Sequence, residues 1–309
     1  MTDSRTSCFY LTQAGPTRPE CVRTRTPFLT GLALIAFAAN SILCRMAMGQ
    51  ETIDAAGFTI LRLISGALVL WLLTATTRRN KPGESRGNWL SAAMLFSYAV
   101  TFSFAYVSLN TGTGALILFG AVQATMFAAA LWRGESPGLP EYIGLLIALG
   151  GLTYLVFPGL EAPSLWGALL MTLAGISWGV YSIRGRGADD PVAVTRDNFL
   201  RAAVFVLLIG LIYYPSLQIS LKGAVLAVIS GAVTSALGYV IWYAALQDLR
   251  AVQAGLVQLL VPVLAAAGGV VFLSELLSLR LAVAALLILG GIALAISYPI
   301  LAGKKKASH

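Results

Sequence analysis

The stretch that decides the fold is VFLSELLSLRLAVAALLILGG, residues 271–291, which is apolar except for one acidic residue and a polar break ahead of a double glycine. A weaker version, LWRGESPGLPEYIGLLIALGG, occupies residues 131–151. Six of the 21 positions match without a gap at an offset of 140 residues, among them Glu135 with Glu275 and the double glycine 150–151 with 290–291. Shared leucines carry little weight in so leucine-rich a chain, so the glutamate and the glycines are what indicate an internal repeat.

The composition predicts a membrane protein. Of the 309 residues, 58% are hydrophobic and only 11% are charged, whereas about 25% are charged in an ordinary soluble domain. Apolar runs of about 18 residues or more recur, each long enough to cross a hydrocarbon core of about 30 Å as a helix. We expect ten spans, at residues 28–48, 57–77, 89–109, 112–132, 141–158, 164–182, 197–215, 222–246, 251–273 and 279–301. The fold class is therefore all-α integral membrane.

The spans divide the chain into two halves with two tails. Residues 1–27 contain arginines and prolines and no long apolar stretch, so we expect a disordered basic arm without a signal peptide. The first five-helix repeat covers 28–158, the second covers 164–301, and residues 302–309 form a basic C-terminal tail. The three cysteines have no metal-binding spacing, and the single histidine is the last residue, so no cofactor is expected.

The placement of basic residues predicts the orientation. With the N-terminus in the cytoplasm, 16 of the 21 Lys and Arg residues fall on the inner side and three on the outer side. This bias follows the positive-inside rule and places both termini in the cytoplasm. It also accounts for most of the net charge of +8, so no nucleic-acid partner is needed, and membrane lipids are the expected surroundings.

A repeat of five spans implies inversion. Because five is odd, the second copy must enter the membrane from the opposite side, which is the usual construction of secondary transporters with a substrate site near the midplane. The same offset of 140 pairs Ser41 with Tyr181, and an offset one residue shorter pairs Arg62 with Arg201.

Three segments carry a resemblance to a known family: LVPVLAAAGGVVFLSELLSLRLAVAALLILGG (260–291), FTILRLISGALVL (58–70) and ISWGVYSIRGR (176–186). Together with the earlier Gly-Glu echo they resemble the EamA-type branch of the drug/metabolite transporter superfamily, and within it the YddG-type exporters of aromatic and neutral amino acids. The resemblance implies ten helices in two inverted five-helix bundles and a central cavity lined mainly by helices 1, 3, 4, 6, 8 and 9. It also implies export of amino acids or related metabolites.

Aromatic residues recur at helical spacing inside three spans. Such rings are candidates to line a substrate cavity, because Tyr and Trp combine an apolar face with a hydrogen-bonding edge and can hold an ammonium group. The alternative is an interfacial belt or plain helix packing. The candidate substrate-binding rings are Tyr98, Phe102, Trp178, Tyr181, Tyr239, Trp242 and Tyr243, with Thr101 on the neighbouring polar stripe.

Uncharged polar residues also lie inside the apolar runs. Such groups should face protein or a wet cavity rather than lipid, and interhelical hydrogen bonding is an equally good explanation. The candidates are Asn40, Ser41, Gln123 and Gln258. Pro262 removes one backbone hydrogen bond in the middle of its helix, for which helix flexing is the favoured role.

Charged residues near the spans have structural or gating interpretations. Arg62 and Arg201 could meet a substrate carboxylate, but snorkelling or capping of a neighbouring helix is favoured. Glu135 and Glu275 stand ahead of the fifth and tenth helices, and we expect them to cap those helices.

None of the 13 acidic residues falls in the central part of a span. A proton-coupled exporter needs a buried carboxylate or histidine, so facilitated diffusion by alternating access is favoured. No enzyme motif is present, and we expect a monomeric carrier of small molecules, amino acids and possibly aromatic ones. A multidrug or cation exporter and a non-transporting scaffold remain the alternatives.

Overall fold

A computed structural model describes residues 21–77, 87–134, 138–156 and 163–306. In these ranges the chain is helical, and one isolated antiparallel bridge, Ile53 with Ile219, joins two loops. The helical elements are α1 (Cys21–Gly49), α2 (Ala55–Thr77), α3 (Trp89–Ala105), α4 (Thr111–Trp132), α5 (Leu139–Val156), α6 (Leu165–Gly185), α7 (Pro191–Tyr213), η1 (Tyr214–Ser216), α8 (Leu221–Ile229), η2 (Ser230–Leu237), α9 (Gly238–Leu246), α10 (Ala251–Gln258), α11 (Val261–Leu273) and α12 (Leu279–Lys306).

These elements form ten helical segments. The π-helical stretch η2 joins α8 and α9 into one continuous segment, and α10 and α11 form another with a break between them. Seven of the segments are long and apolar enough to cross a membrane, and the apolar helices Trp89–Ala105, Leu139–Gly151 and Leu279–Gly291 are shorter. Together they correspond to the ten predicted spans.

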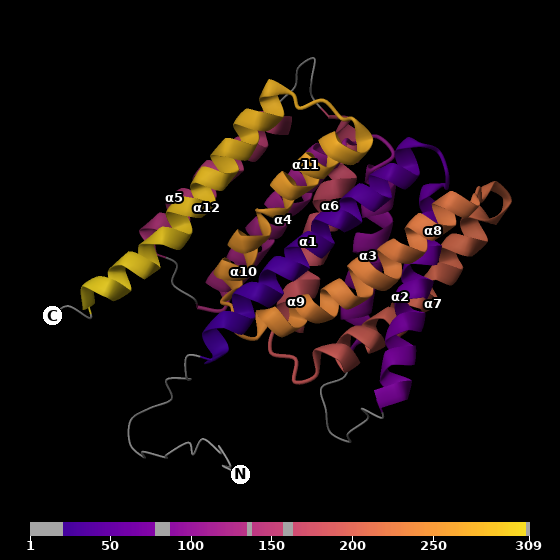
Figure 1. The fold of residues 1–309 in the computed structure, drawn as a ribbon, viewed down its shortest axis with the longest axis horizontal. Helices are drawn as coiled ribbons and strands as arrows, with labels where there is room; N and C mark the ends of the chain where they lie inside the picture. The colour runs from indigo at the N-terminus through magenta and orange to yellow at the C-terminus, as the bar shows by residue number, and fades with distance from the viewer. Residues whose placement is uncertain (1–20, 78–86, 135–137, 157–162, 307–309) are drawn as a thin grey trace, which may run out of the picture.

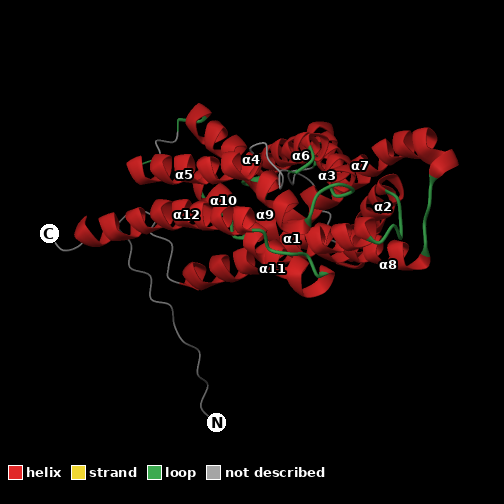
Figure 2. Ribbon diagram, turned by 90° about the horizontal axis from the view of Figure 1, so that it is seen from above, coloured by secondary structure: helices red, strands yellow, loops and turns green. Residues whose placement is uncertain are grey.

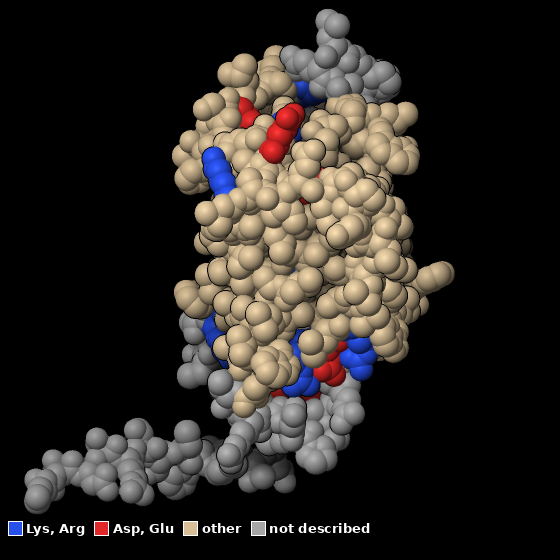
Figure 3. Space-filling model, turned by 90° about the vertical axis from the view of Figure 1, so that its right-hand side faces the viewer, with Lys and Arg blue, Asp and Glu red and all other residues tan. Residues whose placement is uncertain are grey.

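Charged side chains gather toward the two ends of the molecule. Figure 3 shows them above and below a broad band of uncharged residues. Many large apolar side chains are exposed in the helices, for example Leu207, Leu211 and Leu286. An exposed apolar belt between charged ends is the surface expected of a protein surrounded by lipid.

Three helices extend beyond the predicted boundaries. The helix α1 begins at Cys21, so the last seven residues of the expected disordered arm are helical, and residues 1–20 lie outside the described part. The helix α12 runs on to Lys306, through most of the expected tail. The helix α7 begins at Pro191, six residues before the predicted span, because Asp190 accepts hydrogen bonds from two backbone N–H groups of the first turn and proline suits that turn. Polar residues extend all three helices beyond their apolar segments.

The double glycines of the repeat form the contact between α5 and α12. A Cβ on Gly151 would lie 3.1 Å from the carbonyl oxygen of Ala284, and the backbone of Gly291 lies against the carbonyl oxygen of Gly144 in the same way. Ala284 stands 140 residues after Gly144, and Gly291 stands 140 residues after Gly151. Each contact is therefore the repeat equivalent of the other, with α5 and α12 in exchanged roles. The later position of each helix meets the earlier position of its partner, so the two helices run antiparallel.

Other helix pairs that join the two halves also have their repeat counterparts in contact. The helix α3 packs on α6, and the corresponding pair, α1 with η2 and α9, is also in contact. The helix α4 packs on α6 while α1 packs on α11, and α2 packs on its counterpart α7. Figures 1 and 2 show α5 and α12 side by side at one edge of the bundle and α2, α7 and α8 at the opposite edge. The remaining helices surround the centre between these edges.

Candidate functional site

Arg62 of α2 lies inside the bundle with 1% of its surface exposed. Its Nε donates to Ser235 Oγ at 2.9 Å, and its Nη2 donates to Tyr98 OH at 3.1 Å and to Tyr239 OH at 2.7 Å. Its Nη1 has no hydrogen-bond partner. The expectation that Arg62 snorkels to the membrane surface is therefore wrong, because neighbouring hydroxyl groups hold the guanidinium in the interior.

Asn40 of α1 connects this arginine to the rest of the centre. Its Nδ2 donates to Tyr98 OH at 3.1 Å, and its Oδ1 accepts from Ser230 Oγ at 2.6 Å and from Thr234 Oγ1 at 3.3 Å. Together with the bonds of Arg62, these hydrogen bonds join α1, α2, α3, η2 and α9 through side chains that are all buried. We refer to Asn40, Arg62, Tyr98, Ser230, Thr234, Ser235 and Tyr239 as the Arg62 network.

The π-helical stretch η2 supplies three of these side chains. Each turn of a π-helix is wider than an α-helical turn, and such segments are frequent at functional sites. Gly231 brings the stretch against α2, because a Cβ at this position would overlap the backbone oxygen of Arg62. The close approach places Ser235 within hydrogen-bond distance of the guanidinium.

An aromatic cluster packs against the Arg62 network. Trp178 is its centre, with ring centroids 4.5 Å from Tyr239, 5.2 Å from Tyr98 and 5.2 Å from Phe37. All seven rings predicted for the site are at least 96% buried, and each contacts another ring of the cluster, Trp242 through Phe37. The cluster consists of Phe37, Tyr98, Phe102, Trp178, Tyr181, Tyr239, Trp242 and Tyr243. The structure therefore brings the predicted rings together as a packed wall.

Amide groups border the other side of this cluster. Trp178 Nε1 donates to Gln258 Oε1 at 2.8 Å, and Gln258 Nε2 donates to Ala254 O at 2.9 Å. Both polar atoms of the Gln123 side chain are buried without a partner. Pro262 lies in the first turn of α11, just after the helix break that follows Gln258. The break agrees with the missing N–H of proline, and its role in flexing stays a prediction.

Thr101 and Ser41 belong to neither the Arg62 network nor the aromatic cluster. Thr101 Oγ1 donates to the carbonyl of Ser97, and both residues line an outward-facing groove between α3, α6 and α7 of about 610 Å³. Ser41 is buried, and its Oγ has no hydrogen-bond partner. Thr101 thus lies on the polar stripe beside the aromatic face of α3, and this stripe faces the groove.

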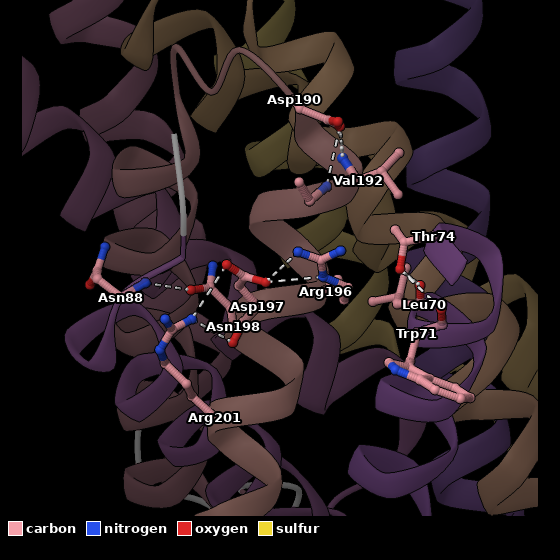
Figure 4. Close-up of polar contacts among 11 residues, drawn as sticks. Leu70, Trp71, Thr74, Asn88, Asp190, Val192, Arg196, Asp197, Asn198 and Arg201 are labelled. Atoms are coloured by element: carbon pink, nitrogen blue, oxygen red, sulfur yellow. Dashed lines mark hydrogen bonds and ion pairs between the residues drawn. The ribbon is translucent and has the colours of Figure 1, made fainter. Parts of the chain in front are cut away.

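Arg201, the repeat counterpart of Arg62, lies in a different environment. It donates to the carbonyl of Asp197 at 3.1 Å and lies 3.7 Å from the carboxylate of the same residue. Figure 4 shows this pair in a polar group where Asn198 Oδ1 also accepts from Asn88 N at 3.1 Å. Arg201 is thus bound to a carboxylate of its own helix, whereas Arg62 has hydroxyl partners from other helices.

An ion pair lies at each end of the bundle. At the Glu275 end, the Glu275 carboxylate accepts from Thr111 N at 3.0 Å and lies 3.5 Å from Arg45 Nε. It therefore caps α4 and not α12, whose cap is Ser278, because the loop before α12 folds back over the start of α4. At the opposite, Arg250 end, Arg250 Nη2 lies 2.9 Å from Glu141 Oε1. Glu135 lies outside the described residues.

Within the described ranges, no three His, Cys, Asp or Glu side chains lie together as a metal site requires.

Four central residues were missed by the sequence reasoning: Phe37, Ser230, Thr234 and Ser235. The last three stand in SGAVTSALG, residues 230–238, where polar positions recur on one side of a helix. Small hydroxyl side chains are common in membrane helices and usually bond their own backbone, so this pattern did not stand out. The π-helical turn that aims them at Arg62 and Asn40 leaves no clear signal in the sequence.

Comparisons with known proteins bear on this site. Residues 165–297 match the model of the EamA-like transporter family. An uncharacterized protein of Pseudomonas aeruginosa is 53% identical over 270 residues, which cover 87% of this chain and 94% of the relative.

More distant relatives have descriptive names. The uncharacterized transporter YoaV of Bacillus subtilis is 22% identical, over 80% of this chain and 89% of the relative. The threonine/homoserine exporter RhtA of Salmonella typhimurium is 29% identical, over 82% of this chain and 87% of the relative. One crystal structure superposes with a TM-score of 0.64 at 20% identity, covering 86% of this chain and 95% of that one, which shows a shared fold.

Proposed function

Because the chain belongs to the EamA-like transporter family, we propose that it exports amino acids or related small metabolites across the bacterial inner membrane. Family membership and the apolar helices make it a multi-pass membrane transporter. The threonine/homoserine exporter among the relatives supports an amino-acid cargo. We expect the carrier to function as a monomer.

The observation that carries the proposal is the Arg62 network packed against the aromatic cluster. A small zwitterion that leaves water needs replacement hydrogen bonds for its charged groups and an apolar wall for its side chain. Arg62, Tyr98 and Tyr239 supply the first, and the ring of Trp178 supplies the second. This combination suits a small polar molecule with an apolar part.

The cationic charge of Arg62 argues against the multidrug alternative. A lipophilic cation at this site would be repelled by a buried guanidinium. We therefore expect purified protein in proteoliposomes to move labelled amino acids and not tetraphenylphosphonium. Flux of the cation alone would support the multidrug exporter instead.

The exchange of contacts between the halves supports an inverted repeat and alternating access. Residues 28–158 and 164–301 would be the two repeats, related by an axis in the membrane plane. We expect the ion pairs at the Glu275 end and the Arg250 end to hold opposite ends of the bundle closed. Opening of one end at a time would expose the centre to each side of the membrane in turn.

We propose that transport is uncoupled. In the described spans, the buried carboxylates Glu141 and Asp190 stand at or beside helix starts, where they cap α5 and α7. A proton carrier needs a titratable group at depth, and the Arg62 network consists of hydroxyl, amide and guanidinium groups. The substrate gradient would then drive export.

Counterflow in proteoliposomes tests the proposal. Vesicles loaded with unlabelled L-threonine or L-phenylalanine should accumulate the labelled amino acid faster than vesicles without protein. A pH gradient imposed without an amino-acid gradient should not concentrate the label. Accumulation driven by pH alone would overturn uncoupled transport, and absence of counterflow for all common amino acids would overturn the amino-acid cargo.

A further inference from the structure

Some hydrogen-bond donors of the Arg62 network have no acceptor within it. Arg62 Nη1 carries two N–H groups that have no acceptor among the described residues. Tyr98 OH accepts from both Asn40 Nδ2 and Arg62 Nη2, and Tyr239 OH accepts from Arg62 Nη2, so these bonds use neither phenolic hydrogen. Even if one phenol donates to the other, one O–H remains. The unmatched groups are therefore all donors.

The charge at this place is also unmatched. Arg62 contacts hydroxyl groups and aromatic rings, whereas Arg45, Arg196, Arg201 and Arg250 each have a carboxylate within 4.0 Å. A buried guanidinium cannot lose its proton, and a charge in a low-dielectric interior is costly unless it is paired. An anion that meets Nη1 would supply both the acceptor and the missing charge.

We infer that Arg62 Nη1, with the Tyr98 and Tyr239 hydroxyls beside it, binds the carboxylate of the transported molecule, so that one carboxylate is the feature all substrates share. The inference rests on the proposed function and names the substrate class of the same site. A carboxylate has the planar geometry and the acceptor oxygens that a guanidinium binds best. One guanidinium surrounded by neutral groups matches a single negative charge, so a phosphate ester, with about two charges, is disfavoured.

Analogues that differ only in the acid group give the first test. In counterflow of labelled L-threonine, unlabelled L-threonine should compete, whereas L-threoninamide and L-threonine methyl ester, which keep the ammonium group, should compete about tenfold less or worse, the loss expected when hydrogen bonds to a charged group are removed. Equal competition by the amide would overturn the inference while leaving amino-acid transport in place.

Substitution of Arg62 gives the second test. Arg62→Gln should reduce the rate of amino-acid counterflow about tenfold or more. Arg62→Lys should give an intermediate rate, because lysine keeps the charge but lacks the planar guanidinium. Arg201→Gln is the matched control, since Arg201 is bound to Asp197 outside the site, and it should transport at a rate near wild type. Wild-type flux in Arg62→Gln would overturn the inference.

A binding measurement separates a binding role from a structural one. Sodium salts of L-threonine, L-phenylalanine and L-lactate should raise the unfolding temperature of the wild-type protein in detergent, relative to equal sodium chloride. They should not raise it in Arg62→Gln, because the guanidinium that would meet the carboxylate is gone. If chloride or phosphate gives the same stabilisation, or if the acids still stabilise Arg62→Gln, the carboxylate site is wrong.

These outcomes distinguish the two proposals. Acids that stabilise the wild-type protein but not Arg62→Gln, without any amino-acid counterflow, would support the carboxylate site and overturn the amino-acid cargo. Amino-acid counterflow that does not depend on Arg62 or on the carboxylate would do the reverse.

Discussion

Arg62 of α2 and Tyr98 of α3 are joined twice, by a hydrogen bond of 3.1 Å from Nη2 to the phenol and by a guanidinium carbon 5.0 Å from the centre of the same ring. Since Tyr98 also accepts from Asn40, this one side chain links α1, α2 and α3. Its hydroxyl group and its ring therefore have separable roles.

Tyr98→Phe keeps the ring and removes the hydroxyl. The change leaves donors of Arg62 and Asn40 without their acceptor, a loss of about 1–3 kcal/mol, so we expect amino-acid counterflow to fall about tenfold or more. Replacement by Ala would be a poorer test, because a cavity in this packed cluster costs about 3–5 kcal/mol and would impair folding.

The control for this change is Tyr142→Phe. Tyr142 is 40% exposed and contacts Phe127 through its ring, so its counterflow should equal wild type. Tyr98→Phe protein that folds and transports normally would show that the hydroxyl contributes only to packing.

The repeated glycines give a prediction about stability. Gly291 faces the α5 backbone, whereas a Cβ on the adjacent Gly290 would meet no atom within 4 Å. Gly291→Val should therefore force α5 and α12 apart and lower the free energy of unfolding by about 1–3 kcal/mol. Gly290→Val should change it little, as judged by thermal unfolding in detergent. Equal effects at both positions would contradict the α5–α12 contact described above.

The sequence predicted the helices and their repeat because both depend on local composition and on a pair of matching motifs. The glycine pair at 290–291 and its echo at 150–151 indicated a relation between two helices that the structure shows in contact. Helix ends were less predictable, because caps such as Asp190 lie beyond the apolar runs.

The candidate site was predicted in its rings but not in its polar centre. Aromatic residues at helical spacing are visible in a sequence, and Trp178 and Tyr239 do meet. The environment of Arg62 depends on how α2 packs on η2, where Gly231 allows close approach. A tertiary contact of this kind has no local signature, so the sequence favoured snorkelling, the commoner role of an arginine in a membrane helix.

Asn40 should be the residue of α1 that stabilises the centre most. Asn40→Ala removes the acceptor of Ser230 and the donor to Tyr98, and leaving buried partners unsatisfied costs about 1–3 kcal/mol each. Thr30→Ala on the same helix is the control, because the Thr30 hydroxyl is buried without a partner and its loss should be neutral. A thermal unfolding midpoint that falls equally in both variants would mean that the Asn40 bonds contribute nothing specific.

The last prediction concerns closure at the Glu275 end. Cys44 is fully buried, one residue before Arg45, which pairs with Glu275. In a chain whose other two cysteines, Cys8 and Cys21, are replaced by Ser, a maleimide should label Cys44 slowly. Glu275→Ala removes both the cap on α4 and the partner of Arg45, and hydrogen bonds to a charged group are worth about 1.5–3 kcal/mol. We therefore expect labelling of Cys44 to be about tenfold faster or more.

Glu141→Ala breaks the ion pair at the Arg250 end and is the control. If alternating access holds, it should leave Cys44 labelling unchanged or slower. Faster labelling in both variants would indicate general loosening of the bundle and not a closure that belongs to one end.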